Sequence, residues 1–160
     1  MVTFSIREDD LSGEPVRELL REHLHDVTRH APPESNHALD VNALRDPAVT
    51  FWSAWADDRL VACGALLELT PVHGEIKSMR TATDFRRQGA GAAILSHLIA
   101  TARSRGYERV SLETGSSDAF SPAHALYRRF GFVPCEPFAD YRSDPHSIFM
   151  TLLLGDATGP

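Results

Sequence analysis

The middle of the sequence restricts the fold most, because it changes from a strand pattern to a helix pattern and back. Residues 74–81 (GEIKSMRT) are strand-like, and residues 92–105 repeat apolar side chains at helical spacing up to Gly106. Residues 109–113 (RVSLE) return to a strand pattern. A strand, a helix and a strand in this order normally form a right-handed crossover between parallel strands. The sequence therefore predicts a mixed sheet with helices on its faces.

The segments on either side of this unit add further strands and helices. We expect strands at residues 2–7, 132–135 and 147–154, helices at residues 15–31 and 122–130, and a hairpin at residues 50–69 with its turn at Asp57 and Asp58. Residues 34–47 are polar and bounded by prolines. We expect a loop there, with one helical turn around residues 41–44.

The length and charge of the chain narrow the function classes. A chain of 160 residues with 42% hydrophobic and 24% charged residues is typical of one soluble domain. We expect this domain to span residues 1–154, with a flexible tail at residues 155–160. A net charge of -6 argues against a nucleic-acid partner. Because no signal sequence and no apolar run near the roughly 20 residues of a membrane span is visible, we expect a cytoplasmic protein with no membrane partner.

The cysteines and histidines form no metal-binding pattern. Cys63 and Cys135 lie far apart in apolar, strand-like segments, and we expect both to be buried thiols. Eight histidines are present, but none combines with other ligands at the spacing of a zinc site. His23 and His25 lie on different faces of their predicted helix. We therefore expect no metal.

The turn before the central helix has the composition of an anion site. Residues 85–92 read FRRQGAGA. Without Cβ atoms, Gly89 and Gly91 let the backbone approach a ligand at a helix N-terminus, where free amides attract phosphate oxygens, and Arg86 and Arg87 add charge. A plain connection with solvated arginines fits the same residues. The P-loop and the dinucleotide fingerprint do not, because their Gly-Lys-Ser/Thr end and third glycine are missing.

Two motifs give the chain a resemblance to a known superfamily. The pattern Arg86-x-x-Gly89-x-Gly91 follows a strand, opens a helix and resembles the acetyl-CoA loop of the GNAT N-acetyltransferases. Further along, ALYRRFGF resembles the second hallmark of that superfamily, with Tyr127 followed by a Gly-Phe pair. The predicted order of strands and helices is also that of the superfamily. Other stretches resemble a bacterial branch of acetyltransferases whose substrates are poorly defined.

The resemblance implies a fold and an activity. The fold would be α/β (α+β), with a mixed, largely antiparallel sheet of about six to seven strands and about four flanking helices. The activity would be acetyl-CoA-dependent N-acetyl transfer to the amine of a small molecule or peptide, made directly in a ternary complex. A non-catalytic acyl-CoA binding module and a nucleotide-binding regulator are the alternatives. A homodimer could form through an exposed sheet edge near the C-terminus.

The resemblance also assigns residues to the coenzyme. In the superfamily, the backbone of the strand before the loop pairs with the pantetheine arm, and the corresponding residues are Met79, Arg80 and Thr81. The loop holds the pyrophosphate, which here implicates Arg86, Arg87, Gln88, Gly89, Ala90, Gly91 and Ala92. This chain has Phe120 where the superfamily commonly has an asparagine. The contact of that asparagine could pass to Ser116, Ser117, Asp118 or Ser121.

The chemistry requires a base and an acid. An alkyl ammonium keeps its proton up to a pKa of about 10, so the acceptor amine must lose a proton before it attacks. We expect Glu75 to be the base, because it matches the basic glutamate of the histone-acetylating branch, with Glu113, Glu68 and His73 as alternatives. Tyr127 matches the superfamily tyrosine that protonates the leaving thiolate. Candidates for contacting the acceptor are Trp52, Glu68, His37, Asp140, Tyr141 and His146.

Overall fold

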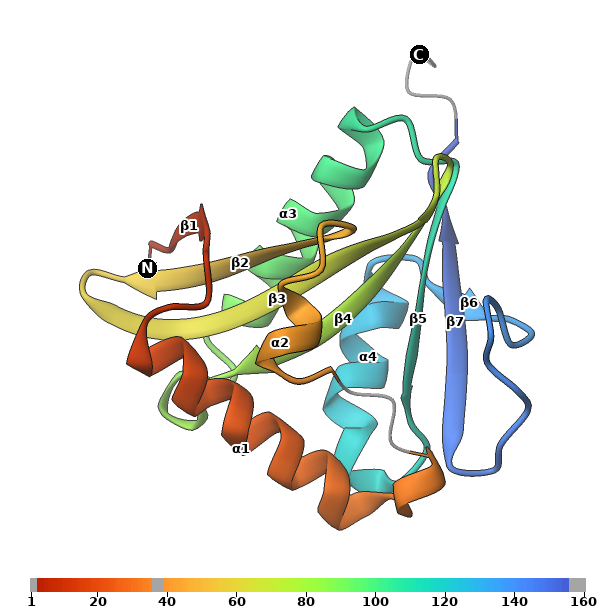
Figure 1. Cartoon of the computed structure of the whole chain (residues 1–160), viewed down its shortest axis with the longest axis horizontal. Helices are drawn as coiled ribbons and strands as arrows, with labels where there is room; N and C mark the ends of the chain where they lie inside the picture. The colour runs from red at the N-terminus through yellow and green to blue at the C-terminus, as the bar shows by residue number, and fades with distance from the viewer. Residues whose placement is uncertain (1–2, 36–38, 156–160) are drawn as a thin grey trace.

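A single sheet forms the centre of the computed structural model, which describes residues 3–35 and 39–155 (Figure 1). The seven strands are β1 (Ser5–Glu8), β2 (Val49–Ala56), β3 (Arg59–Thr70), β4 (His73–Thr81), β5 (Arg109–Gly115), β6 (Val133–Pro134) and β7 (Ser147–Leu153). Their order across the sheet is β1-β2-β3-β4-β5-β7-β6. The pair β4–β5 is parallel, and the other five pairs are antiparallel. The predicted fold class is confirmed.

Helices cover both faces of the sheet. The helices α1 (Glu14–His30) and α2 (Val41–Leu44) lie on one face, and α3 (Ala90–Ser104) and α4 (Ser121–Arg129) lie on the other (Figure 1). Strand β3 separates two cores, since Cys63 and Ala65 pack with α1 while Ala62 and Leu66 pack with α3. This two-sided burial explains why its sequence is nearly continuous in apolar residues.

Gly64 in β3 allows a close approach of α3. A Cβ atom at this position would lie 2.7 Å from Ile94 Cγ2 and 2.9 Å from Met79 Sδ, both too short for a carbon contact. The absence of a side chain therefore lets α3 and the Met79 side chain pack directly on β3.

A β-bulge interrupts β4 opposite Gly64. Cys63 is paired with Arg80 and Ala65 with Lys77, so two residues of β4 face one residue of β3. One of the two, Ser78, has a φ of 56°. After the bulge, the Arg80 side chain reaches α1 on the opposite face from α3 and forms an ion pair with Asp26 at 2.6 Å.

Three sequence predictions need correction, and one lies partly outside the described residues. Strand β1 spans Ser5–Glu8 rather than residues 2–7. Strand β6 contains only Val133 and Pro134 rather than residues 132–135, because Phe132 is buried in the core and proline cannot donate a ladder hydrogen bond. Cys63 is buried, and burial raises the pKa of its thiol to about 12, but Cys135 is only half-buried. Residues 156–160 of the predicted tail are not among the described residues.

Candidate active site

Strands β4 and β5 separate partway along their length. They are paired only where residues 73–76 meet residues 109–112. Beyond this point, β4 continues beside β3 as far as Thr81, and β5 continues beside β7 as far as Gly115. Figure 1 shows the two strands diverging, with α4 behind the opening. We call the pairing segment the paired half and residues 77–81 with 113–115 the open half.

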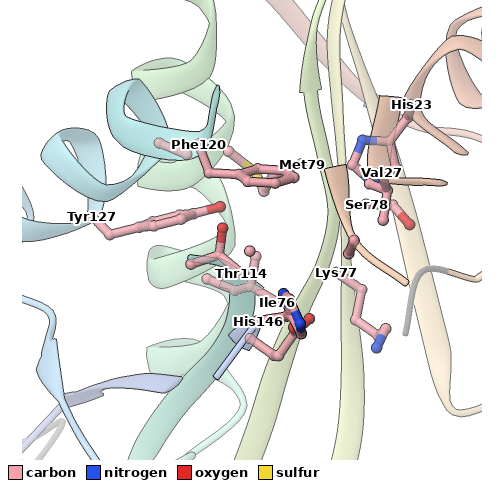
Figure 2. Close-up of a pocket in the computed structure, with 14 residues that line it drawn as sticks. His23, Val27, Ile76, Lys77, Ser78, Met79, Thr114, Phe120, Tyr127 and His146 are labelled. Atoms are coloured by element: carbon pink, nitrogen blue, oxygen red, sulfur yellow. The ribbon is translucent and has the colours of Figure 1, made fainter. Parts of the chain in front are cut away.

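The open half contains a pocket bounded by α1, α4 and the end of the β6–β7 connection. Its lining residues are His23, Val27, Ala31, Ile76, Lys77, Ser78, Met79, Glu113, Thr114, Gly115, Phe120, Ala123, Tyr127 and His146. Figure 2 shows Met79, Phe120 and Tyr127 on one side of β4 and His23, Val27 and Ser78 on the other. The pocket thus has an aromatic side and a side formed with α1.

Tyr127 points its hydroxyl into the pocket from α4 (Figure 2). Helix α4 begins with Pro122 in its first turn, and the Tyr127 ring packs against Phe132 with ring centres 5.7 Å apart. The side chain is buried, and no hydrogen bond to its hydroxyl is found among the residues that the structure describes. Burial, helped by the negative charge of Glu113, raises the pKa of Tyr127 above its ordinary value. The hydroxyl is therefore protonated at neutral pH and can donate its proton.

Phe120 occupies the aromatic side of the pocket and packs directly on the end of β5. A Cβ atom on Gly115 would lie 2.3 Å from Phe120 Cε2, so the ring needs a glycine beneath it. Its edge also meets the His30 ring at a centre distance of 6.0 Å, which connects α4 to the end of α1. An apolar ring thus stands where the superfamily commonly has an asparagine.

The four polar residues near Phe120 do not line the pocket. Ser116 donates to the Pro145 carbonyl oxygen at 2.7 Å, and Asp118 and Ser121 are exposed. The Ser117 hydroxyl is buried without a hydrogen-bond partner in the described ranges. The structure does not bring a substitute for the asparagine into the pocket.

Glu75 lies at the end of the paired half and belongs to a buried cluster. Lys77 Nζ is 3.2 Å from Glu75 Oε2, and the side chains are 9% and 4% exposed. Tyr141, from the connection between β6 and β7, donates to Glu75 Oε2 at 2.5 Å and accepts from Lys77 Nζ at 2.9 Å. Burial and the charge of Glu75 raise the pKa of Tyr141. Lys77 lines the pocket, whereas Glu75 lies behind it.

The three alternative bases, Glu113, Glu68 and His73, differ in their access to the pocket. Glu113 lines the pocket, and Ser147 Oγ donates to its Oε2 at 2.7 Å. Glu68 is exposed and accepts a hydrogen bond from Tyr107 at 2.8 Å, away from the pocket. His73 Nε2 is 2.8 Å from Ser111 Oγ in the paired half. Of these three, only Glu113 has direct access to the pocket.

Four polar residues that line the pocket were not predicted as site residues, namely His23, Lys77, Ser78 and Thr114. Lys77 lies two residues after Glu75 along β4, and His23 lies one turn before Val27 on the pocket side of α1. Burial and the nearby charge of Arg80 lower the pKa of His23 to about 4, so its imidazole is neutral at pH 7. The alternation of β4 could have indicated Lys77, but no local pattern places His23 opposite a strand some fifty residues away.

The turn before α3 presents free backbone amides. Gly89 has a φ of 90° and Arg87 a φ of 65°, and the amide of Ala93 donates to Gly89 O at 2.9 Å as the first α-helical bond. Gly89 provides no side-chain cap, so the amides of residues 90–92 remain available at the helix start. Arg86, Arg87 and Gln88 are exposed. This geometry suits an anion.

The turn also touches the end of β4. A Cβ atom on Gly91 would lie 3.2 Å from Thr81 Oγ1, which brings the first turn of α3 against the strand. The Ala82 amide donates to Val61 O at 2.8 Å, so by the alternation of an antiparallel ladder the backbone groups of Thr81 point away from β3. Met79 lines the pocket, while the Arg80 side chain is engaged by Asp26.

Only some of the residues predicted to contact the acceptor lie at the pocket. His146 lines the pocket, and Tyr141 reaches it through Lys77. Trp52 packs against His97 of α3, on the other face from α1, and Asp140 is exposed. Glu68 is remote, as described above, and His37 lies outside the described residues.

The described residues contain neither a metal-binding cluster nor a membrane-spanning helix. No group of three His, Cys, Asp or Glu side chains in these ranges is placed to hold a metal ion. No helix in the described part of the chain is both long and apolar enough to span a membrane.

Comparisons with known proteins agree with one another. A family model described as the acetyltransferase (GNAT) family matches residues 14–132. The uncharacterized N-acetyltransferase YsnE of Bacillus subtilis is 57% identical over 149 residues, which cover 93% of this chain and 99% of the relative. A crystal structure from Klebsiella pneumoniae has 26% identity and a TM-score of 0.76, covering 95% of this chain and 98% of the other. A GNAT acetyltransferase from Elizabethkingia anophelis, crystallised with acetyl-CoA, has 16% identity and a TM-score of 0.66, covering 94% and 97%.

Proposed function

Because the chain belongs to the GNAT family of acetyltransferases and is an acyltransferase, we propose that it transfers an acetyl group directly from acetyl-CoA to the amine of a small molecule or peptide. The observation that supports this proposal most is the open half of β4 and β5, where the Tyr127 hydroxyl enters a pocket formed between the two strands. Side chains on both sides of β4 line the pocket, an arrangement that suits a reaction between two substrates.

The donor substrate would occupy the open half and the turn before α3. The exposed Arg86 and Arg87 and the amides of residues 90–92 provide positive charge and hydrogen-bond donors for a pyrophosphate. The backbone groups of Met79 and Thr81 would pair with the amides of the pantetheine arm. The relative crystallised with acetyl-CoA has the same fold, which supports this choice of donor. The thioester of the donor supplies the activated acyl group.

Tyr127 would act as the general acid. Its raised pKa keeps the phenol protonated, and its hydroxyl points into the pocket, so it can give its proton to the sulfur that leaves the acyl group. The amine nitrogen forms the new bond to the acyl carbon as the carbon–sulfur bond breaks. No covalent acyl-enzyme is needed, because both substrates reach the same pocket.

We propose Glu75 as the base that receives the proton that the acceptor ammonium must lose before its nitrogen attacks. Its buried carboxylate is next to Lys77, which lines the pocket, so the proton would travel through water or through the groups that contact Lys77. Glu113 is the competing base, since it lines the pocket directly. Variants of each carboxylate distinguish these two routes.

A pair of measurements tests the proposed function. Calorimetry should show binding of acetyl-CoA, with ATP and NAD much weaker, and a thiol assay should show coenzyme release that depends on an added primary amine. Tighter binding of ATP than of acetyl-CoA would indicate a nucleotide-binding regulator. Acetyl-CoA binding with no amine-dependent release across a broad amine panel would indicate a binding module.

A further inference from the structure

On the α1 side of the pocket, Ser78 and His23 have no hydrogen-bond partner among the described residues. Ser78 is 8% exposed, and its hydroxyl is buried without a hydrogen-bond partner among residues 3–35 and 39–155. His23 lines the same pocket, and no hydrogen bond to its ring forms within the described part of the chain. Buried polar groups in folded proteins are normally paired, so the Ser78 hydroxyl indicates a missing partner, and the half-buried His23 ring offers a second group to the same partner.

The bulge in β4 places Ser78 on the α1 side of the pocket. Figure 2 shows Ser78 with Val27 and His23 on one side of the strand, while its neighbour Met79 lies on the side of Tyr127. The positive φ of 56° at Ser78 is unfavourable for a residue with a side chain. Such a conformation is retained where the surrounding structure enforces it, often at a functional site. We call Ser78, Val27 and His23 the α1 corner.

The α1 corner offers uncharged hydrogen-bonding groups. A serine hydroxyl both donates and accepts, and a neutral imidazole has one donor and one acceptor nitrogen. The lowered pKa of His23 keeps its ring neutral at pH 7. Each nearby cation already faces one carboxylate, Lys77 facing Glu75 and Arg80 facing Asp26, although Arg80 Nε has no hydrogen-bond partner among the described residues. A carboxylate on the ligand would therefore compete with a carboxylate of the protein for either cation.

We propose that the α1 corner binds an uncharged hydrogen-bonding group, a hydroxyl or an amide, on the acceptor amine. The inference rests on the proposed function and narrows its substrate class. The reacting amine lies towards Tyr127, and the polar group lies on the opposite side of β4, against Ser78 and His23. Acceptors with an alkyl group or a carboxylate at this point are disfavoured, because the first leaves the Ser78 hydroxyl unpaired and the second is buried beside cations that already face carboxylates.

Pairs of amines with the same shape test this inference. The wild-type protein should acetylate ethanolamine with a kcat/KM about tenfold above that of propylamine, and glycinamide about tenfold above isobutylamine and above glycine. Glycylglycinamide distinguishes a peptide N-terminus from a small amide. The Ser78→Ala and His23→Leu variants should lose most of the preference by slowing the polar amine while leaving its alkyl partner within about twofold.

The control variant is His25→Leu, which changes an exposed histidine of the same helix and should retain the full preference. Thermal melting checks folding, and Ser78→Ala should not lower the melting temperature, because it removes a hydroxyl that has no partner. If the wild type turns over amines without preferring the polar member, or if the variants slow both members equally, the inference is wrong. If no amine is acetylated at all, the proposed function itself fails.

Discussion

The paired and open halves of β4 and β5 differ in how their polar side chains are satisfied. In the paired half, Ser111 Oγ lies 2.8 Å from both His73 Nε2 and Thr151 Oγ1, so three side chains complete one another. In the open half, neither the Ser78 nor the Tyr127 hydroxyl has a hydrogen-bond partner among the described residues. Arg109 Nε is the one buried side-chain polar atom of the paired half without a hydrogen-bond partner in the described ranges, so the same two strands provide a largely satisfied polar network at one end and a site for a ligand at the other.

The largest loss of stability is expected when the ion pair between Glu75 of the paired half and Lys77 of the open half is broken. Glu75→Gln leaves the buried Lys77 charge without its carboxylate, and we expect the free energy of unfolding to fall by about 3–5 kcal/mol. Urea unfolding measures this loss. The double variant Glu75→Gln with Lys77→Met should recover most of the stability, because no buried charge remains unpaired.

The double variant also separates structure from chemistry. If Glu75 is the base, acetyl transfer stays low although the fold is restored. Recovery of full activity would assign Glu75 a structural role. Glu113 would then be the base, and Glu113→Gln should abolish the increase in rate with pH that we expect from deprotonation of the acceptor amine. Steady-state rates between pH 6 and pH 9 provide the comparison.

The next largest effect is a loss of turnover, and it should differ between a tyrosine in the pocket and a tyrosine beside the paired half. Tyr127→Phe removes the proposed acid from the open half and should lower kcat about 100-fold with acetyl-CoA affinity retained. Tyr107→Phe is the matched control, since that hydroxyl donates to Glu68 beside the paired half. Equal turnover by the two variants would exclude Tyr127 as the acid.

A smaller loss of stability is expected when either of two glycines that pack against aromatic rings is replaced by alanine. A Cβ atom on Gly74, in the paired half, would lie 2.7 Å from Tyr107 Cε2, and one on Gly115 would lie 2.3 Å from Phe120 Cε2. Gly74→Ala and Gly115→Ala should each lower the free energy of unfolding by about 1–3 kcal/mol. Only Gly115→Ala should weaken acetyl-CoA binding in calorimetry, because only Phe120 lines the pocket. An equal loss of affinity would show that the halves are not independent.

The smallest effect is a pH dependence of stability. The folded-state pKa of His23 is about 4, below the value of about 6.5 in an unfolded chain, so the unfolded chain binds its proton first as the pH falls. The full shift corresponds to about 3 kcal/mol in unfolding free energy, and because the His23 ring is only half-buried, solvent screening should reduce the decrease to about 1–2 kcal/mol as the pH falls from about 6.5 to 4. Urea titrations should show this decrease in the His25→Leu control and a smaller one in His23→Leu.

The sequence alone predicted the features that depend on neighbouring residues. The hairpin over residues 50–69, the single helical turn at Val41–Leu44 and the parallel crossover of β4 and β5 all follow from local patterns, and the structure has all three. The sequence also predicted the glycine turn before α3 and the motif containing Tyr127, because each is a short segment whose local backbone conformation requires particular residues. Together they pointed to the family.

Only the tertiary structure decided which of these residues meet. The point where β4 leaves β5 and the bulge at Ser78 depend on strand register, which sequence patterns define poorly. Tyr141 joins Glu75 from 66 residues away, and His23 faces β4 from a separate helix. Burial and charges from distant parts of the sequence then determined which polar side chains of the pocket are ion-paired, which stay neutral and which have no hydrogen-bond partner among the described residues. The sequence determined the elements and the family, and the packing of those elements determined the chemistry available in the pocket.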